Sequence, residues 1–233
     1  LKSEYIPAFE RLGELYEREG HWAGALAAYQ RALHLGADNA LYHYKIGMIY
    51  KRTGHSQEAA RYLERAVELQ PALIEAYEQL GDLYEAQQRY DEALQAYEQA
   101  AVIAPHKAAH HDQIGRLCRH LGHLDKAVAH FRRMIELQPE NSRAYYELGK
   151  SYQLQAQYDE ALRAYLEAIK REPGVADYYY NAGLAYKQLK RYPEGAAMFR
   201  KAVELQPHYT DAYKQWAAVS AASFLRRHHR GDV

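Results

Sequence analysis

Hydrophobic residues recur along the chain with the spacing of amphipathic helices that come in pairs. Within residues 74–107, Tyr77, Leu80 and Tyr84 lie at i, i+3 and i+7, which places them on one face of a first helix. A second helix is predicted directly downstream, where the same periodicity continues at Tyr90, Ala93, Leu94, Tyr97, Ala100 and Ala101. Because the turn between the two segments is short, we expect the two helices to be antiparallel.

This helix pair repeats with a period of 34 residues, which three rows of residues mark. The first row consists of glycines: Gly13, Gly47, Gly81, Gly115, Gly149 and Gly183. The second row consists of prolines: Pro71, Pro105, Pro139, Pro173 and Pro207. The third row is Ala25, Ala59, Ala93, Ala127 and Ala161, with Gly195 in the sixth place. After a lead-in at 1–5, the rows divide the chain into six repeats at 6–39, 40–73, 74–107, 108–141, 142–175 and 176–209. Residues 210–233 follow as a C-terminal capping helix, at about 210–228, and a basic tail.

The small residues of these rows indicate tight packing between helices. A glycine inside a helix costs about 1 kcal/mol relative to alanine, so a row of six implies that helix backbones approach closely. We expect the glycine and alanine rows to face one another, with Tyr, Leu and Phe side chains filling the gaps. Each proline should end a second helix. Asn39 and Asn141 are predicted N-caps, and Pro193 is placed in the first turn of its helix.

These residues resemble the tetratricopeptide repeat family. Its pattern has an aromatic residue at position 4, Leu-Gly at 7 and 8, Tyr at 11, Ala at 20, an aromatic at 24, Ala at 27 and Pro at 32. Two repeats match every column: Tyr77, Leu80, Gly81, Tyr84, Ala93, Tyr97, Ala100 and Pro105, and then Tyr145, Leu148, Gly149, Tyr152, Ala161, Tyr165, Ala168 and Pro173. The departures are His43, His111, Cys118, Met134 and Ala37. The resemblance implies an all-α fold, a right-handed superhelical solenoid of antiparallel helix pairs.

The resemblance also implies where a ligand would bind. In this family the first helices line a concave groove, and their positions 2, 5, 6, 9 and 12 face the ligand. The candidate groove residues are Tyr44, Lys45, Arg116, Arg119, Arg143, Tyr146, Lys150, Tyr180, Asn181 and Lys187. Since the longest basic and aromatic stretch crosses the last three repeats, we expect an extended peptide with acidic, phosphorylated or C-terminal carboxylate groups. The alternative is a solvated face. A chaperone-tail clamp is not expected, because no repeat has Lys at position 5 with Asn at position 9.

Composition and charge argue against some classes of partner. The chain has 233 residues, with 30 Lys and Arg against 30 Asp and Glu, and this balance argues against a nucleic-acid partner. No apolar run approaches the roughly 18 residues of a membrane span, so membrane insertion is not expected. The first residues lack both a signal-peptide pattern and an initiator Met, so we expect a cytoplasmic chain, which could be a piece of something longer. The lone Cys118 rules out an internal disulfide.

The sequence gives little indication of metal binding or catalysis. Histidines cluster in the fourth repeat at His106, His110, His111, His120, His123 and His130. The spacings of three and four could share a metal, but His111 falls in a packing column, so we interpret these residues as core and surface histidines that make this repeat acid-sensitive. Carboxylates should lie on exposed helix faces, which leaves no acid–base pair. The sequence predicts no metal, cofactor or catalytic activity, and Arg230-Gly231-Asp232 is interpreted as coincidence.

The C-terminal helix and the function leave alternatives open. Tyr213 and Trp216 should face the stack, while Val219, Phe224 and Leu225 make the helix more apolar than a plain cap. It could close over the sixth repeat, or it could contact a partner, a second copy or further chain. The favoured function is a non-catalytic adaptor or scaffold that binds a peptide. The alternative is an excised regulatory or substrate-docking region of a larger enzyme or sensor.

Overall fold

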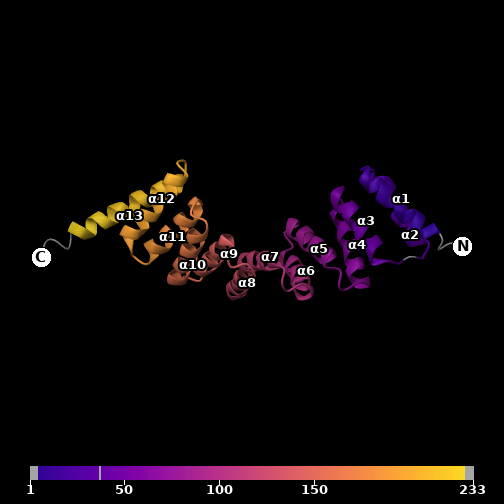
Figure 1. Ribbon diagram of the computed structural model, residues 1–233, viewed down its shortest axis with the longest axis horizontal. Coiled ribbons are helices and arrows are strands. Elements are labelled where there is room, and N and C mark those ends of the chain that lie inside the picture. The colour runs from indigo at the N-terminus through magenta and orange to yellow at the C-terminus, as the bar shows by residue number, and fades with distance from the viewer. Residues whose placement is uncertain (1–4, 37, 229–233) are drawn as a thin grey trace. The chain divides into compact units, whose positions relative to one another are not determined.

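The structure, a computed structural model, describes residues 5–36 and 38–228, with side chains up to residue 221. This part of the chain forms thirteen α-helices and no strand (Figure 1). The first helices of the six pairs are α1 (Ile6–Arg18), α3 (Ala40–Arg52), α5 (Ile74–Ala86), α7 (Ala108–His120), α9 (Ser142–Leu154) and α11 (Ala176–Gln188). The second helices are α2 (Trp22–His34), α4 (Ser56–Leu69), α6 (Tyr90–Ile103), α8 (Leu124–Leu137), α10 (Tyr158–Arg171) and α12 (Tyr192–Leu205), and α13 (Thr210–His228) follows.

Helix ends lie where the local signals predict them. From α4 onward, each second helix ends two residues before a proline of the 34-residue row. The Asn39 side chain accepts a hydrogen bond from Leu41 N (2.8 Å), and that of Asn141 accepts one from Ala144 N (3.3 Å), so both predicted N-caps are confirmed. Pro193 lies in the first turn of α12, as expected.

Every helix pair turns through one residue in the left-handed region of the backbone. Three of these residues are glycines, Gly20, Gly54 and Gly122, with φ between 72° and 83°. The other three are Gln88 (φ 61°), Ala156 (58°) and Lys190 (60°), which occupy the same repeat position. A residue with a Cβ is strained in this conformation, so half of the turns accept a cost that glycine avoids.

The six glycines of the 34-residue row mainly face aromatic rings, which differs from the expected glycine–alanine contact. A Cβ built on Gly149 would lie 2.5 Å from Cε1 of Tyr165, and one built on Gly183 would lie 2.7 Å from Cε1 of Phe199. The nearest atom is thus the bulky residue at repeat position 24. The residues of the alanine row are fully buried. In the second repeat the backbone of this row also approaches the glycine, since a Cβ built on Gly47 would lie 3.3 Å from the Ala59 carbonyl oxygen. The glycine therefore makes room for a ring as well as for a backbone.

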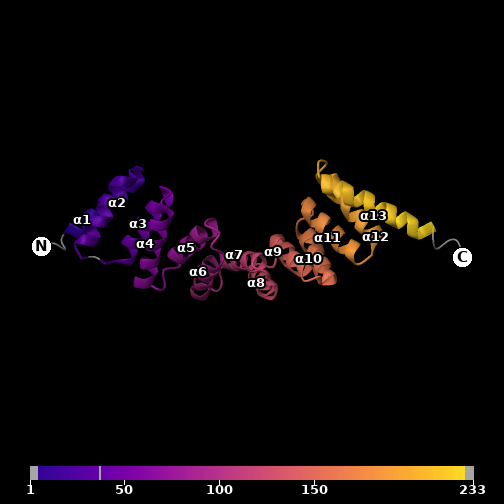
Figure 2. The same ribbon diagram turned by 180° about the vertical axis from the view of Figure 1, so that it is seen from behind.

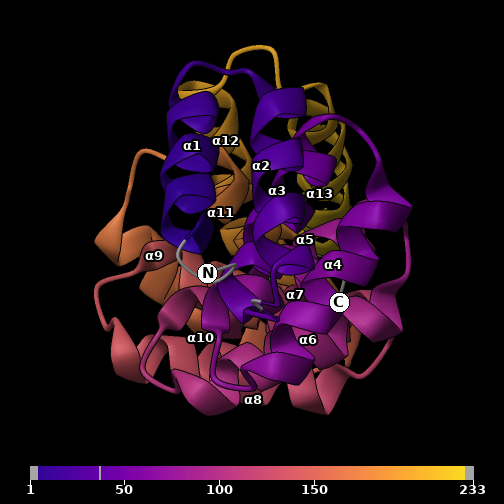
Figure 3. The same cartoon turned by 90° about the vertical axis from the view of Figure 1, so that its right-hand side faces the viewer.

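Contacts divide the chain into two compact units, Leu1–His106 and Lys107–Val233. In the first unit, each first helix contacts its second helix, and α2·α3 and α4·α5 contacts join consecutive pairs. The second unit follows the same rule through α8·α9, α10·α11 and α12·α13 (Figure 2). Figure 3 shows α1 and α2 lying next to one another as the first of these pairs. Within each unit the helices therefore stack in chain order.

The C-terminal helix contacts α12 through a face that differs from the predicted one. Ala212 and Val219 are buried, and Trp216 is half-buried, so these three residues at i, i+4 and i+7 form the contact face. Tyr213 is 45% exposed, and its predicted orientation toward the stack is wrong because it lies a quarter-turn away from that face. The side chains of Phe224 and Leu225, and the tripeptide at 230–232, lie outside the described part of the chain. No described helix has the length and hydropathy needed to cross a bilayer.

Candidate peptide-binding groove

Eight of the ten predicted groove residues lie on the first helices of the second unit. Arg116 and Arg119 belong to α7. Arg143, Tyr146 and Lys150 belong to α9, and Tyr180, Asn181 and Lys187 belong to α11. Side-chain contacts connect them from one repeat to the next: Arg143 reaches Asp112 on α7, and Asn181 reaches Tyr146 on α9. We call this connected set of positions on α7, α9 and α11 the basic groove.

Two arginines of the basic groove share one carboxylate. The Asp112 Oδ2 atom lies 3.4 Å from Arg116 Nε and 3.2 Å from Arg143 Nη2. The other oxygen, Oδ1, is buried and accepts no hydrogen bond within the described residues. Arg116 and Arg143 keep 37% and 56% of their side-chain surface exposed. Since one negative charge faces two positive charges, the cluster retains a net positive charge that a ligand can reach.

Glu147 forms a tighter and more buried cluster beside it. This residue is only 5% exposed. Its carboxylate accepts hydrogen bonds from Arg119 and from Lys150 Nζ (2.9 Å). Burial alone would raise the pKa of Glu147, but the hydrogen bond from Lys150 and the charge of Arg119 outweigh it, so the pKa is lowered. The predicted exposure of all carboxylates is therefore wrong for Glu147. Its i, i+3 spacing from Lys150 is the one sign of this pairing that the sequence carries.

Tyrosines form the wall of the basic groove. The Tyr146 ring lies 4.9 Å from that of Tyr178, and the Lys150 Nζ atom stands 4.7 Å from the Tyr146 ring centroid. Asn181 Nδ2 donates a hydrogen bond to the Tyr146 hydroxyl (3.1 Å). Burial, reinforced by the charges of Asp177 and Glu147, raises the pKa of Tyr146 to about 12, so its phenol is neutral at pH 7. The two rings are thus tilted by 39° to one another, and Tyr146 is uncharged and held by contacts between repeats.

The remaining two predicted residues of this unit, Tyr180 and Lys187, also lie on α11. The Tyr180 ring packs 4.9 Å from that of Tyr209, whose hydroxyl donates a hydrogen bond to Asp177 Oδ1 (2.8 Å). Lys187 Nζ donates a hydrogen bond to Gln215 Oε1 (2.8 Å). Taken over repeat positions 2, 5, 6, 9 and 12 of α7, α9 and α11, the groove carries five cationic residues and three anionic ones. These positions therefore have an excess of two positive charges.

Four family models of the tetratricopeptide (TPR) repeat match the chain, over residues 13–54, 40–73, 72–140 and 146–210. The chain belongs to the tetratricopeptide repeat family. TPR proteins bind protein or peptide partners and are typically non-catalytic, so this chain is a protein–protein interaction scaffold built on an all-α TPR solenoid.

Solved TPR structures share this fold. YrrB, described as a TPR protein with an unusual peptide-binding site, superposes with a TM-score of 0.70 at 23% identity, covering 80% of this chain and 96% of its own. MamA gives a TM-score of 0.68 at 24% identity, covering 76% and 96%. PilF of Pseudomonas aeruginosa gives 0.60 at 16% identity, covering 95% and 99%. A search of curated proteins finds no match. At these identities the solved structures establish the fold alone.

The first unit of the TPR chain holds the other two predicted residues, Tyr44 and Lys45, on α3. They line a cavity of about 330 Å³ together with Trp22, Met48 and other residues. Lys45 Nζ lies 2.8 Å from Glu17 Oε2, so its charge is already paired. Repeat positions 2, 5, 6, 9 and 12 of α1, α3 and α5 carry seven anionic residues and three cationic ones. This stretch therefore differs in sign from the basic groove, and the structure does not join the ten predicted residues into one basic surface.

In the histidine-rich fourth TPR repeat, His110 and His111 are buried, whereas His106, His120 and His123 are exposed. His111 and Cys118 are buried, as their packing columns predict. The Nδ1 atoms of His111 and His130 lie 3.0 Å apart, which joins α7 to α8. The described residues contain no group of three or more His, Cys, Asp and Glu side chains placed to hold a metal ion.

Proposed function

We propose that the basic groove binds an extended segment of a partner protein that carries acidic or C-terminal carboxylate groups, and that the chain acts as a non-catalytic adaptor. The observation that carries this proposal is the sharing of Asp112 by Arg116 and Arg143. Two guanidinium groups that share one carboxylate can bind a second carboxylate from a ligand. Bidentate bonds from arginine to carboxylate supply both the energy and the direction of such contacts.

The other groove residues divide into structural and ligand-facing roles. Arg119 is only 17% exposed and is held by Glu147, so it stabilises the helix packing and contributes charge from below the surface. Tyr146 offers a rigid aromatic wall, of the residue type enriched at binding hot spots. The Asn181 amide nitrogen already donates to Tyr146 and to the Asp177 carbonyl, whereas its Oδ1 accepts no hydrogen bond from another described residue. That oxygen is available to a peptide N–H.

A peptide ligand agrees with the description of a protein of similar fold. YrrB is described as having an unusual peptide-binding site. An anionic ligand agrees with the excess of positive charge on α7, α9 and α11. Because exposed charges of the basic groove would attract the peptide through a field that salt screens, the affinity for the peptide should fall as the salt concentration is raised.

A labelled decapeptide rich in Glu, with a free C-terminus, tests the proposal by fluorescence anisotropy. The double variant Arg116→Gln/Arg143→Gln should bind it at least about tenfold more weakly than the wild type, since two charge-assisted contacts are lost. Arg133→Gln is the matched control, because Arg133 is an exposed arginine on α8 that pairs with Glu136 within its own helix. Equal affinities of the double variant and the wild type would contradict the proposal. So would tighter binding of the same peptide with Lys in place of Glu.

A further inference from the structure

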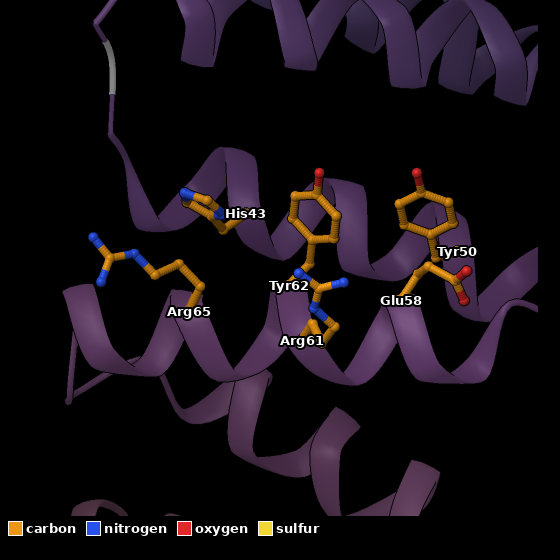
Figure 4. Close-up of a pocket in the computed structure, with 6 residues that line it drawn as sticks. All are labelled: His43, Tyr50, Glu58, Arg61, Tyr62 and Arg65. Carbon is orange, nitrogen blue, oxygen red and sulfur yellow. The ribbon is translucent and has the colours of Figure 1, made fainter.

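A second cavity lies in the same helix pair as Tyr44 and Lys45 but on a different face of α3. It has a volume of about 480 Å³ and is lined by His43, Tyr50, Glu58, Arg61, Tyr62 and Arg65 (Figure 4). These residues come from α3 and α4 of the second repeat, and none of them occupies a ligand-facing position of the groove. The volume falls in the range of about 300–1,000 Å³ that small-molecule and side-chain sites occupy.

Three rings form one wall of this cavity. Tyr50 and Tyr62 are stacked, with centroids 5.5 Å apart and ring planes 28° apart. The His43 ring continues the row at 5.7 Å from Tyr62, so His43, Tyr62 and Tyr50 follow one another along the cavity (Figure 4). Burial, then the neighbouring Tyr62 and Glu58, raise the pKa of Tyr50, so this wall is uncharged. A wall of adjacent ring faces and edges suits a planar aromatic group.

The charged residues of the cavity differ in whether they already have partners. Arg65 bonds to Asp38 (2.7 Å) and to Glu68 (3.0 Å). Arg61 makes no hydrogen bond or ion pair to another residue in the described part of the chain, and neither does Glu58. His43 Nε2 lies 2.9 Å from Asp38 Oδ1, while its Nδ1 is buried without a partner among the described residues. The cavity therefore holds one unpaired guanidinium, one unpaired carboxylate and one unsatisfied ring nitrogen beside an aromatic wall.

The equivalent cavity of the fifth repeat shows that the fold does not require this combination. Its volume is about 310 Å³, and its lining includes the residues three repeats further along the chain: Tyr145, Tyr152, Glu160, Arg163, Ala164 and Glu167. There Arg163 is paired with Glu160 at 2.8 Å, Ala164 stands in the place of Tyr62, and Glu167 stands in the place of Arg65. The second repeat thus has an unpaired arginine and a third ring that the fifth repeat lacks.

We propose that the cavity of the second repeat binds an aromatic group that carries a single carboxylate. The carboxylate accepts hydrogen bonds from the Arg61 guanidinium, and the ring packs against Tyr62 and Tyr50. The unpaired Glu58 disfavours a second negative charge in the cavity, so the site selects a monoanion over a phosphate-like dianion. This site is independent of the basic groove, which lies in the other unit.

Isothermal titration calorimetry with 3-phenylpropionate, propionate and 3-phenylpropylamine tests the proposal on the full chain. The aromatic carboxylate should bind, and both the ring-free acid and the amine should bind at least about tenfold more weakly, because each lacks one of the two recognised groups. Arg61→Gln should weaken binding by a similar factor, and so should Tyr62→Ala, which installs the residue of the fifth repeat. Arg163→Gln is the matched control and should leave the affinity unchanged.

Three outcomes would overturn the proposal. One is the absence of saturable binding of 3-phenylpropionate up to roughly 10 mM, a concentration about tenfold above a Kd of 1 mM. Another is equal affinity of the wild type and Arg61→Gln, with thermal unfolding confirming that both are folded. The third is preferential binding of the amine, which would assign recognition to Glu58. The Arg116→Gln/Arg143→Gln variant should bind 3-phenylpropionate like the wild type, so failure of this site and failure of the groove are separable.

Discussion

At the residue scale, the fold depends on the fit between each glycine of the 34-residue row and the bulky side chain at repeat position 24. A Cβ added to Gly81 would lie 2.5 Å from the Tyr97 ring, and one added to Gly115 would lie 2.8 Å from the Phe131 ring. Glycine weakens an isolated helix by about 1 kcal/mol relative to alanine. The row persists because a methyl group would displace a buried ring, and tight interiors tolerate that poorly.

Gly149→Ala should therefore lower the free energy of unfolding, although alanine favours the helix. The methyl group would lie 2.5 Å from the Tyr165 ring, and overpacking of this kind typically costs about 1–3 kcal/mol. Urea unfolding followed by circular dichroism measures the change. Gly174→Ala is the control, since no atom lies within 4 Å of the position that its methyl group would take, and it should change stability by less than about 0.5 kcal/mol. A Gly149→Ala protein as stable as the wild type would refute the packing argument.

The turn residues give a prediction of the opposite sign. Ala156 adopts a φ of 58°, where a Cβ is strained. Ala156→Gly should raise stability by about 0.5–1 kcal/mol, and Gly122→Ala, at the same position one repeat earlier, should lower it by about 1 kcal/mol. The same urea titration measures both. A loss of stability in Ala156→Gly would mean that the entropy of the unfolded chain outweighs the strain.

At the scale of elements, ion pairs connect first helices of successive repeats with unequal strength. Glu147 on α9 is buried between Arg119 of α7 and Lys150 of its own helix. Asp112 on α7 contacts two arginines that remain far more exposed. Removing one partner of a buried pair leaves an uncompensated charge, whereas exposed pairs contribute little. The two clusters should therefore respond differently to neutralisation.

Glu147→Gln should destabilise the second unit by about 2–3 kcal/mol, because Arg119 would keep its buried position without a countercharge. Asp112→Asn should change the free energy of unfolding by less than about 1 kcal/mol. Differential scanning calorimetry of both variants checks the pair of values. Equal effects of the two substitutions would show that burial does not separate the clusters.

The contact between α7 and α8 predicts acid sensitivity. Burial, then the neighbouring His111 and Lys126, lower the pKa of His130 to about 4, below the value of about 6.5 for an unfolded histidine. The unfolded chain therefore binds more protons than the folded chain between these values. Stability contributed by the neutral ring is present above pH 6.5 and is lost as the pH falls toward 4.

His130→Gln should reduce the fall in unfolding midpoint between pH 7.5 and pH 5.0, because glutamine does not titrate. The control is His123→Gln, which alters an exposed histidine at the start of α8 and should leave the pH dependence unchanged. Urea midpoints at several pH values supply the comparison. An identical pH dependence in His130→Gln and the wild type would assign acid sensitivity to other groups.

At the scale of the whole molecule, the neutral composition conceals a separation of charge. The chain has equal numbers of acidic and basic residues, yet repeat positions 2, 5, 6, 9 and 12 of the first helices carry four surplus negative charges in the first unit and two surplus positive charges in the second. A scaffold of this kind can discriminate between partner segments by sign. The net charge alone would have missed this property.

The sequence predicted the fold more fully than it predicted the groove. Helix ends depend on signals close in the chain, such as Asn39, Asn141 and the proline row, and these signals were sufficient. Which cations are free depends on partners about one repeat away: Arg119 pairs with Glu147 and Arg143 with Asp112. Periodicity does not encode those choices. The exposure of Tyr213 depends likewise on the exact rotation of α13, which an apolar pattern leaves uncertain by one position.

The central claim is that Arg116 and Arg143 bind an anionic segment and that Asp112 competes with that segment for them. The affinity of the Glu-rich decapeptide for Asp112→Asn tests this claim most directly. Removing the competing carboxylate should strengthen binding by about three- to tenfold and steepen its salt dependence. Unchanged or weaker binding by a folded Asp112→Asn protein would contradict the account.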